Sequence, residues 1–168
     1  KAQALARTLG CVAMDIETML ADPAIDGIVL ALTPGAHAPA AMLAAAAGKP
    51  FLVEKPMALT SIEAQRIAAA AKGAGLVAMT GHVLLFHPAF EAMLDLVRGG
   101  ALGELRHIQS QRMGFGRFLD DTDVAMDLLP HDLSMIEALL DEAPLSAELT
   151  GRPVLTGAID LCEMHLRY

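Results

Sequence analysis

Short apolar runs alternate with longer helix-forming segments through the first half of the chain. Residues 26–32, 51–54 and 76–80 are short and dominated by aliphatic side chains, and each run predicts a strand. Residues 36–47 are rich in alanine and residues 60–72 open with capping-box spacing, so both segments predict helices. This alternation is typical of a parallel sheet, and strands that are apolar throughout indicate a sheet buried on both faces.

Helical segments also precede the first predicted strand. Residues 2–9 predict the end of a helix, and Gly10 is placed to cap it. Residues 15–21 predict a second, short helix that ends at the turn signal Asp22-Pro23. Two helices and a turn are therefore expected before the first strand of the sheet.

The regular alternation ends near residues 81–87, where we place a domain boundary. The elements predicted beyond it are a helix at 88–98, a strand at 105–113, a helix at about 127–140, and strands near 147–155 and 158–168. Strands and helices in this order indicate an α+β unit. We therefore expect an α/β chain with one domain in residues 1–82 and another in residues 83–168.

Composition narrows the class of protein. The 168 residues contain 12 Lys and Arg against 20 Asp and Glu, and this net charge of −8 argues against a nucleic-acid partner. Apolar residues make up 54% of the chain, yet no apolar run approaches the roughly 20 residues that span a membrane. Cys11 and Cys162 make no disulfide framework, and free thiols favour a cytoplasmic location.

Glu54, Lys55 and Pro56 directly follow the second predicted strand. Ligands of open α/β sheets bind at the carboxyl ends of the strands, so this segment is a candidate site. Pro56 disfavours helical geometry at Lys55, and we hypothesise a cis bond that fixes the ammonium for hydrogen bonding to a substrate hydroxyl. The alternative is an ordinary solvated lysine in a loop.

Residues 33–37 follow the first predicted strand in the same way. Thr33 and Gly35 allow a ligand to approach the backbone closely, and the start of the next helix favours an anion or a ribose. The alternative is a helix cap and turn that binds nothing.

Asp127, His131 and Asp132 form the third candidate. Proline is best tolerated in the first turn of a helix, so Pro130 predicts a helix that begins near Asp127. At 3.6 residues per turn, Asp127 and His131 share one face, opposite an apolar stripe that ends at Leu140. A helix start favours the neutral imidazole that a general base needs, whereas the alternative is a solvent-facing histidine.

Further histidines and two arginines lie in the second half of the chain. His82, His87 and His131 match no zinc signature in their spacing, so we expect no metal site. Arg112 and Arg117 flank a Gly-Phe-Gly sequence that lacks the third glycine of a dinucleotide fingerprint. The two arginines suit an anionic substrate group such as a pyrophosphate or carboxylate, or they are simply solvated.

Together these segments resemble the Gfo/Idh/MocA family of NAD(P)-dependent sugar oxidoreductases. The matching order is a strand into Thr33-Pro34…His37, a strand into Glu54-Lys55-Pro56, then Gly81-His82, and then Asp127…His131-Asp132. Residues 81–90, 112–117 and 128–136 are most similar to the branch of UDP-N-acetylglucosamine and UDP-N-acetylglucosaminuronate 3-dehydrogenases. The resemblance implies a partial Rossmann domain with a doubly wound parallel sheet, followed by part of an α+β domain with a large open, mainly antiparallel sheet.

The resemblance also implies roles for single residues. His131 would accept the hydroxyl proton as hydride leaves the sugar carbon for NAD or NADP, Lys55 would hydrogen-bond the same oxygen, and Asp127 would orient substrate or join the relay. The cofactor pocket would include Thr33, Pro34, His37, Glu54, Lys55 and Pro56. The residues expected to contact substrate are His82, Arg112, Arg117 and Asp132.

Three functions fit this picture. The first is an oxidoreductase for a nucleotide sugar, the second an oxidoreductase for a free sugar or polyol of the inositol dehydrogenase type, and the third a catalytically dead sugar-binding module. The family's first strand and glycine-rich phosphate loop have no counterpart in this chain, so we expect a fragment that is inactive alone. Homo-oligomerisation through the open sheet is a further family expectation.

Overall fold

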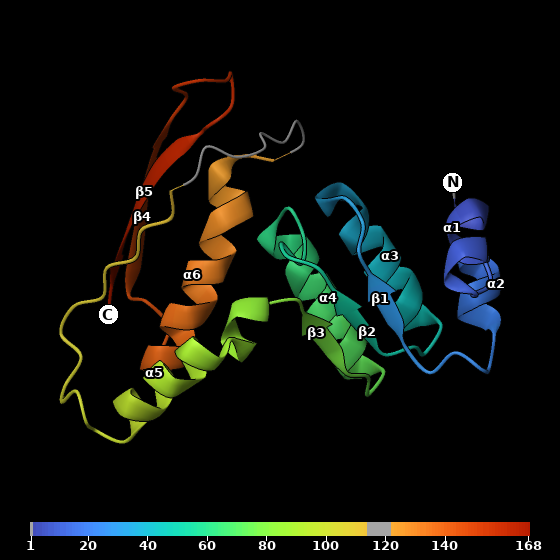
Figure 1. The fold of residues 1–168 in the computed structure, drawn as a ribbon, viewed down its shortest axis with the longest axis horizontal. Helices are drawn as coiled ribbons and strands as arrows, with labels where there is room; N and C mark the ends of the chain where they lie inside the picture. The colour runs from blue at the N-terminus through green and yellow to red at the C-terminus, as the bar shows by residue number, and fades with distance from the viewer. Residues whose placement is uncertain (1, 114–121) are drawn as a thin grey trace.

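The computed structural model describes residues 2–113 and 122–168, in two parts that lie side by side (Figure 1). A parallel sheet with its helices forms one part, and further helices with an antiparallel hairpin form the other. The helices are α1 (Ala2–Leu9), α2 (Ile16–Ala21), α3 (Pro34–Ala46), α4 (Ser61–Gly73), the 3-10 helix η1 (Val83–Phe86), α5 (Pro88–Arg98) and α6 (Val124–Leu140). The strands are β1 (Ile28–Leu30), β2 (Phe51–Val53), β3 (Ala78–Thr80), β4 (Ser146–Arg152) and β5 (Leu161–Arg167).

The parallel sheet has the strand order β1-β2-β3, so β2 is its central strand. Leu30 pairs with Val53, and Val53 pairs with Thr80, which brings the carboxyl ends of all three strands to one edge. This sheet and the separate antiparallel pair β4–β5 confirm the expected fold class, a Rossmann-type α/β part followed by an antiparallel part.

Small side chains allow α3 to lie close to the sheet. Ala41 and Ala44 are completely buried, as are Val53 in β2 and Ile67 in α4. These residues belong to one continuous apolar core between the strands and the two helices. Because alanine adds little width, α3 makes close contact with β1 and β2.

The expectation that both faces of the sheet are buried is wrong for the part of the chain that the structure describes. Ile28 and Leu30 point into the core, but Val29 between them is 70% exposed. Successive side chains of a strand point to opposite faces, and α3 and α4 pack against each other on one side of the sheet. A strand that is apolar throughout therefore has one face in the core and one exposed face in the described part of this chain.

Most helix ends agree with the sequence signals. Asp15 accepts a hydrogen bond from the Thr18 backbone N–H at 2.7 Å and caps α2, as expected for that position. Thr60 and Glu63 form the complete capping box at the start of α4. Gly10, which ends α1, has a φ of 68°, a conformation that glycine adopts without strain.

Helix α6 begins three residues earlier than Pro130 suggested. Asp123 is its N-cap and accepts from the Met126 N–H at 2.9 Å, so Pro130 lies inside the helix. The proline rule describes a local cost, and here the cap and the packing of α6 against η1, α5 and β5 outweigh it. The apolar stripe is only half-buried, whereas Asp132 and Ser134 are among the buried residues of this helix.

Residues 105–113 do not form the predicted strand. No described strand pairs with this segment, since β4 pairs only with β5 in an antiparallel hairpin from Ser146↔Arg167 to Arg152↔Leu161. An alternating pattern needs a neighbour with free backbone groups before it becomes a strand. The segment is attached instead by side chains, as described for the candidate site.

The core predicts a clear difference between two isoleucines of α4. Ile67→Ala should lower the free energy of unfolding by about 3 kcal/mol, since it removes a fully buried side chain and leaves a cavity. Ile62→Ala is the matched control, because Ile62 is 69% exposed on the same helix, and it should cost below about 0.5 kcal/mol. Urea denaturation measures both, and equal losses would contradict this description of the core.

Candidate active site

The site begins at the carboxyl ends of β2 and β3. The strand register continues past Val53 and Thr80, because the Gly81 N–H donates to the Val53 carbonyl at 2.8 Å. A Cβ on Gly81 would lie 3.1 Å from an oxygen of the Glu54 carboxylate. Glycine at this position thus lets the Glu54 side chain lie across the end of the neighbouring strand.

Lys55 reaches from this edge to α6. Its Nζ donates to Asp127 Oδ1 at 2.5 Å and to the Asp127 backbone carbonyl at 2.9 Å. The Lys55 and Asp127 side chains are 20% and 34% exposed, and the Lys55–Pro56 peptide bond is cis, as hypothesised. Two candidates that lie 72 residues apart in the sequence therefore form one ion pair.

His131 lies one helical turn after Asp127 and is half-buried. Burial is the largest cause that lowers the pKa of His131, and the positive charges of Lys55 and Arg112 lower it further, while Asp132 opposes them. The expected direction is right but the expected cause is wrong: α6 begins at Val124, so His131 lies beyond the first turn, where the helix dipole acts.

His82 lies beside the same group of charges. It caps η1 at the end of β3, and burial lowers the pKa of its imidazole against the opposing charge of Glu137. His82 also contributes to the lowered pKa of His131. The Nδ1 atoms of His82 and His131 are both buried, and neither has a hydrogen-bond partner among the described residues.

Asp132 attaches the segment of residues 105–113 to α6. Its Oδ1 accepts from Ser110 Oγ at 2.6 Å, and its Oδ2 accepts from Arg112 Nε at 2.9 Å. Arg112 is thereby held close enough to His131 to affect its proton affinity. Arg117 lies outside the described residues, so its predicted substrate contact stays a prediction.

His37 is placed differently from the other candidates. It is 1% exposed, with Nδ1 2.7 Å from the Pro56 carbonyl and Nε2 3.0 Å from the Leu32 carbonyl. It therefore connects the loop after β1 to the loop after β2. Thr33 is exposed as the N-cap of α3, and Pro34 follows as the first residue of that helix.

Ser110 and Glu137 also act on residues of this site, although no sequence pattern singled them out. Ser110 donates to Asp132 from 22 residues away, and Glu137 acts on His82 from another element. Neither lies in a recognisable spacing pattern. Their roles follow from tertiary contacts alone.

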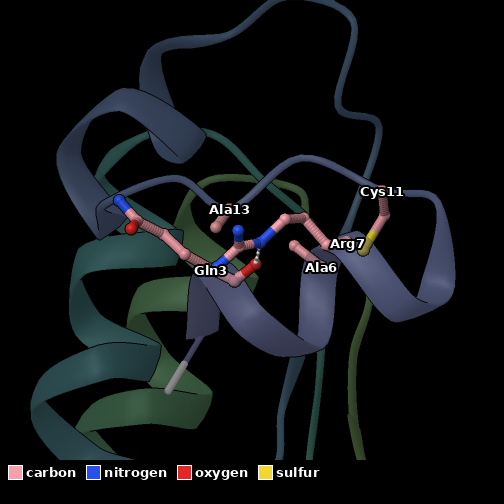
Figure 2. Close-up of a pocket in the computed structure, with 5 residues that line it drawn as sticks. All are labelled: Gln3, Ala6, Arg7, Cys11 and Ala13. Atoms are coloured by element: carbon pink, nitrogen blue, oxygen red, sulfur yellow. Dashed lines mark hydrogen bonds between the residues drawn. The ribbon is translucent and has the colours of Figure 1, made fainter.

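Within residues 2–113 and 122–168, no group of histidine, cysteine or acidic side chains is arranged to hold a metal ion, and no helix has the length and hydrophobicity to cross a membrane. An open pocket near α1 has a volume of about 380 Å³. Figure 2 shows the residues that line it, Gln3, Ala6, Arg7, Cys11 and Ala13. None of the predicted site residues lines this pocket.

Comparison with known proteins places this geometry in a family. A family model described as an oxidoreductase family with an NAD-binding Rossmann fold, that of the Gfo/Idh/MocA proteins, matches residues 1–82. The chain is 33% identical over 129 residues to a dTDP-3,4-didehydro-2,6-dideoxy-alpha-D-glucose 3-reductase of Streptomyces violaceoruber, covering 76% of this chain and 38% of that protein. It is 29% identical over 163 residues to the UDP-N-acetylglucosamine 3-dehydrogenase of Acidithiobacillus ferrooxidans, covering 96% and 50%.

The chain belongs to the Gfo/Idh/MocA oxidoreductase family. A solved structure of UDP-N-acetylglucosamine 3-dehydrogenase from Acidithiobacillus ferrooxidans matches it with a TM-score of 0.86 at 28% identity, covering 98% of this chain and 54% of that one. The chain spans about half the length of that relative and less of the Streptomyces protein. The motifs around Lys55 and His131 thus indicated the correct family.

The environment of His131 predicts a measurable titration. Its pKa should lie below the ordinary value of 6.5, because burial and two neighbouring cations disfavour the imidazolium. Proton NMR of the imidazole signals over a pH series measures this, with His131→Gln used to assign the signal. A pKa above that of a histidine in a short reference peptide would contradict the arrangement of charges.

Proposed function

We propose that the protein carrying this chain transfers hydride between a sugar CH–OH carbon and a nicotinamide cofactor. The observation that carries the proposal is the set of hydrogen bonds that the Lys55 ammonium makes with Asp127. An ammonium group has three N–H donors, and Asp127 accepts two hydrogen bonds from Lys55. No other described residue accepts from Lys55, so one donor is left there for the oxygen of a substrate hydroxyl, at an ammonium whose position the ion pair fixes.

His131 completes the chemistry as the proton acceptor. A base that removes a hydroxyl proton must be neutral, and burial together with the charges of Lys55 and Arg112 lowers the pKa of His131. When the C–H bond breaks, Lys55 stabilises the oxygen by hydrogen bonding and His131 takes the O–H proton. Asp127 keeps the Lys55 ammonium in one orientation between these events.

The residues around the strand ends fit a nicotinamide cofactor. The three carboxyl ends of the sheet meet at one edge, and exposed Thr33 lies there at the start of a 13-residue helix. We assign Thr33, Pro34, Glu54 and Pro56 to the wall of the NAD or NADP site, and His37 to support behind that wall. The cofactor would accept the hydride.

The substrate is proposed to be a nucleotide sugar, in the class of UDP-N-acetylhexosamines. Arg112 supports this choice because its guanidinium is a cation whose charge lowers the pKa of His131 and which suits an anionic group. The names of the Streptomyces and Acidithiobacillus relatives both describe enzymes of nucleotide sugars. A polyol of the inositol dehydrogenase type is the alternative substrate, and a catalytically inert sugar-binding module is the alternative to an enzyme.

Other properties belong to the same proposal. We assign residues 1–82 to the cofactor domain and 83–168 to the substrate domain. We also expect identical copies to associate through β4 and β5, since every residue of β4 is exposed. The free thiols of Cys11 and Cys162 fit the cytoplasm. The 168-residue chain alone should show no turnover, because its sequence holds no glycine-rich phosphate loop.

The role of Lys55 is tested by Lys55→Met in protein expressed from the complete reading frame. The kcat should fall about 10²- to 10⁴-fold because the substrate oxygen loses its donor. Nicotinamide absorbance with UDP-N-acetylglucosamine follows the reaction. Lys72→Met, at an exposed position in the last turn of α4, is the matched control and should leave kcat unchanged.

A Lys55→Met protein that melts like the wild type and keeps full activity would overturn the proposed mechanism. Binding of the sugar without turnover in the wild type would instead favour the inert module. Calorimetry of sugar binding, performed beside the kinetic assay, separates these two results.

The role of Arg112 is tested by comparing two substrates. Arg112→Gln should lower kcat/KM for the nucleotide sugar by about 10- to 100-fold, the loss expected for a hydrogen bond to a charged group. Arg106→Gln is the control, because Arg106 is exposed and pairs only with nearby Glu104. If myo-inositol is the better substrate and Arg112→Gln leaves its turnover unchanged, the polyol alternative is correct.

A further inference from the structure

A buried carboxylate next to His131 has no direct part in the mechanism above. Asp132 is 8% exposed on α6, and its two oxygens accept from Ser110 Oγ and Arg112 Nε. A buried carboxylate is costly unless it is paired and hydrogen-bonded, and these two donors meet that need. Its predicted contact with substrate stays a prediction.

The two donors both come from the segment of residues 105–113. This segment has no ladder of backbone hydrogen bonds to a described strand, and Ser110 and Arg112 attach it to α6 through one side chain. The attachment point, Asp132, directly follows His131 in the sequence. The position of the Arg112 charge relative to His131 therefore depends on this carboxylate.

We infer that Asp132 is a positioning residue, whose buried carboxylate fixes Ser110 and Arg112 to α6 and thereby holds the Arg112 guanidinium beside His131. Its role is to place a cation next to the proton acceptor, with Ser110 as the second anchor of the same segment. That this cation assists catalysis rests on the proposed function. The position of the guanidinium does not depend on that proposal.

The charges that face His131 come from several elements. Lys55 at the end of β2 and Arg112 in the segment of residues 105–113 both disfavour the imidazolium, as does His82 at η1. Asp132 on α6 favours the imidazolium, and Asp127 on the same helix is engaged with Lys55. Removing the Arg112 charge should therefore raise the pKa of His131, provided that the guanidinium is held in place.

A double-mutant cycle tests this dependence. The pKa of His131 is measured by proton NMR in four proteins made from the complete reading frame: wild type, Arg112→Gln, Asp132→Asn and the double variant. Arg112→Gln should raise the pKa clearly in the wild-type background and hardly at all beside Asp132→Asn, where the cation is no longer held. An equal rise in both backgrounds, or none in the wild type, would overturn the inference.

Asp141→Asn is the matched control for the carboxylate. Asp141 ends α6 at an exposed position with a φ of 54°, a conformation that asparagine also adopts readily. The rise caused by Arg112→Gln should be the same beside Asp141→Asn as in the wild type. If the rise also disappears in this background, a general disturbance of the helix explains the effect and the inference fails.

A second measurement keeps the inference testable if Asp132→Asn does not fold. In the wild type, the Nε–H of Arg112 donates to a buried oxygen, whereas the Nε–H of exposed Arg106 faces solvent. Exchange of the Arg112 Nε–H with water should therefore be much slower than that of Arg106. Equal exchange rates would overturn the inference.

Both NMR measurements are independent of turnover. A positive cycle in a protein that oxidises no sugar leaves the positioning role intact and removes the proposed function. A negative cycle in an active dehydrogenase removes the positioning role and leaves the proposed function intact. The two proposals therefore fail separately.

Discussion

The contact between Lys55 and Asp127 connects the two parts of the molecule at the place where chemistry is expected. The two side chains are mostly covered, so water screens their attraction less than at an open surface. Lys55 also donates to the Asp127 backbone carbonyl, which ties the ammonium to the helix itself as well as to a side chain. Since His131 is one turn further along α6, its distance from the sheet edge is set by the same contact.

The position of Lys55 depends in turn on packing deeper in the sheet. Complete burial of Ala41 and Ala44 brings α3 against β1 and β2, and this fixes where the strands end. The His37 ring on α3 then lies between the Leu32 and Pro56 carbonyls, with one ring nitrogen close to each, so the loops that follow both strands share one buried support. Small side chains in one helix thus determine the geometry of an ammonium group at the edge of the sheet.

Residues near one another in the sequence were the ones that sequence patterns predicted well. The strands, the capping box at Thr60 and the family motifs around Lys55 and His131 depend on short-range spacing and on the ends of parallel strands. The bond from Ser110 to Asp132 depends on how a loop meets a helix, and no spacing rule contains that information. The proline rule and the alternating pattern at 105–113 failed for a related reason, because tertiary context decided whether each local preference was followed.

The balance of charge in the site differs from that of the whole chain. The chain carries a net charge of −8, which repels anions at long range. Within the site, Lys55 and Arg112 each have a carboxylate partner, so neither cation produces a strong field far from the surface. An anionic substrate would therefore gain little from electrostatic steering and would be recognised only at close range, where directed N–H donors remain. Such a site would favour geometric selection of a substrate over rapid capture, and the hydride transfer proposed above would need this selection because one C–H bond must be aligned.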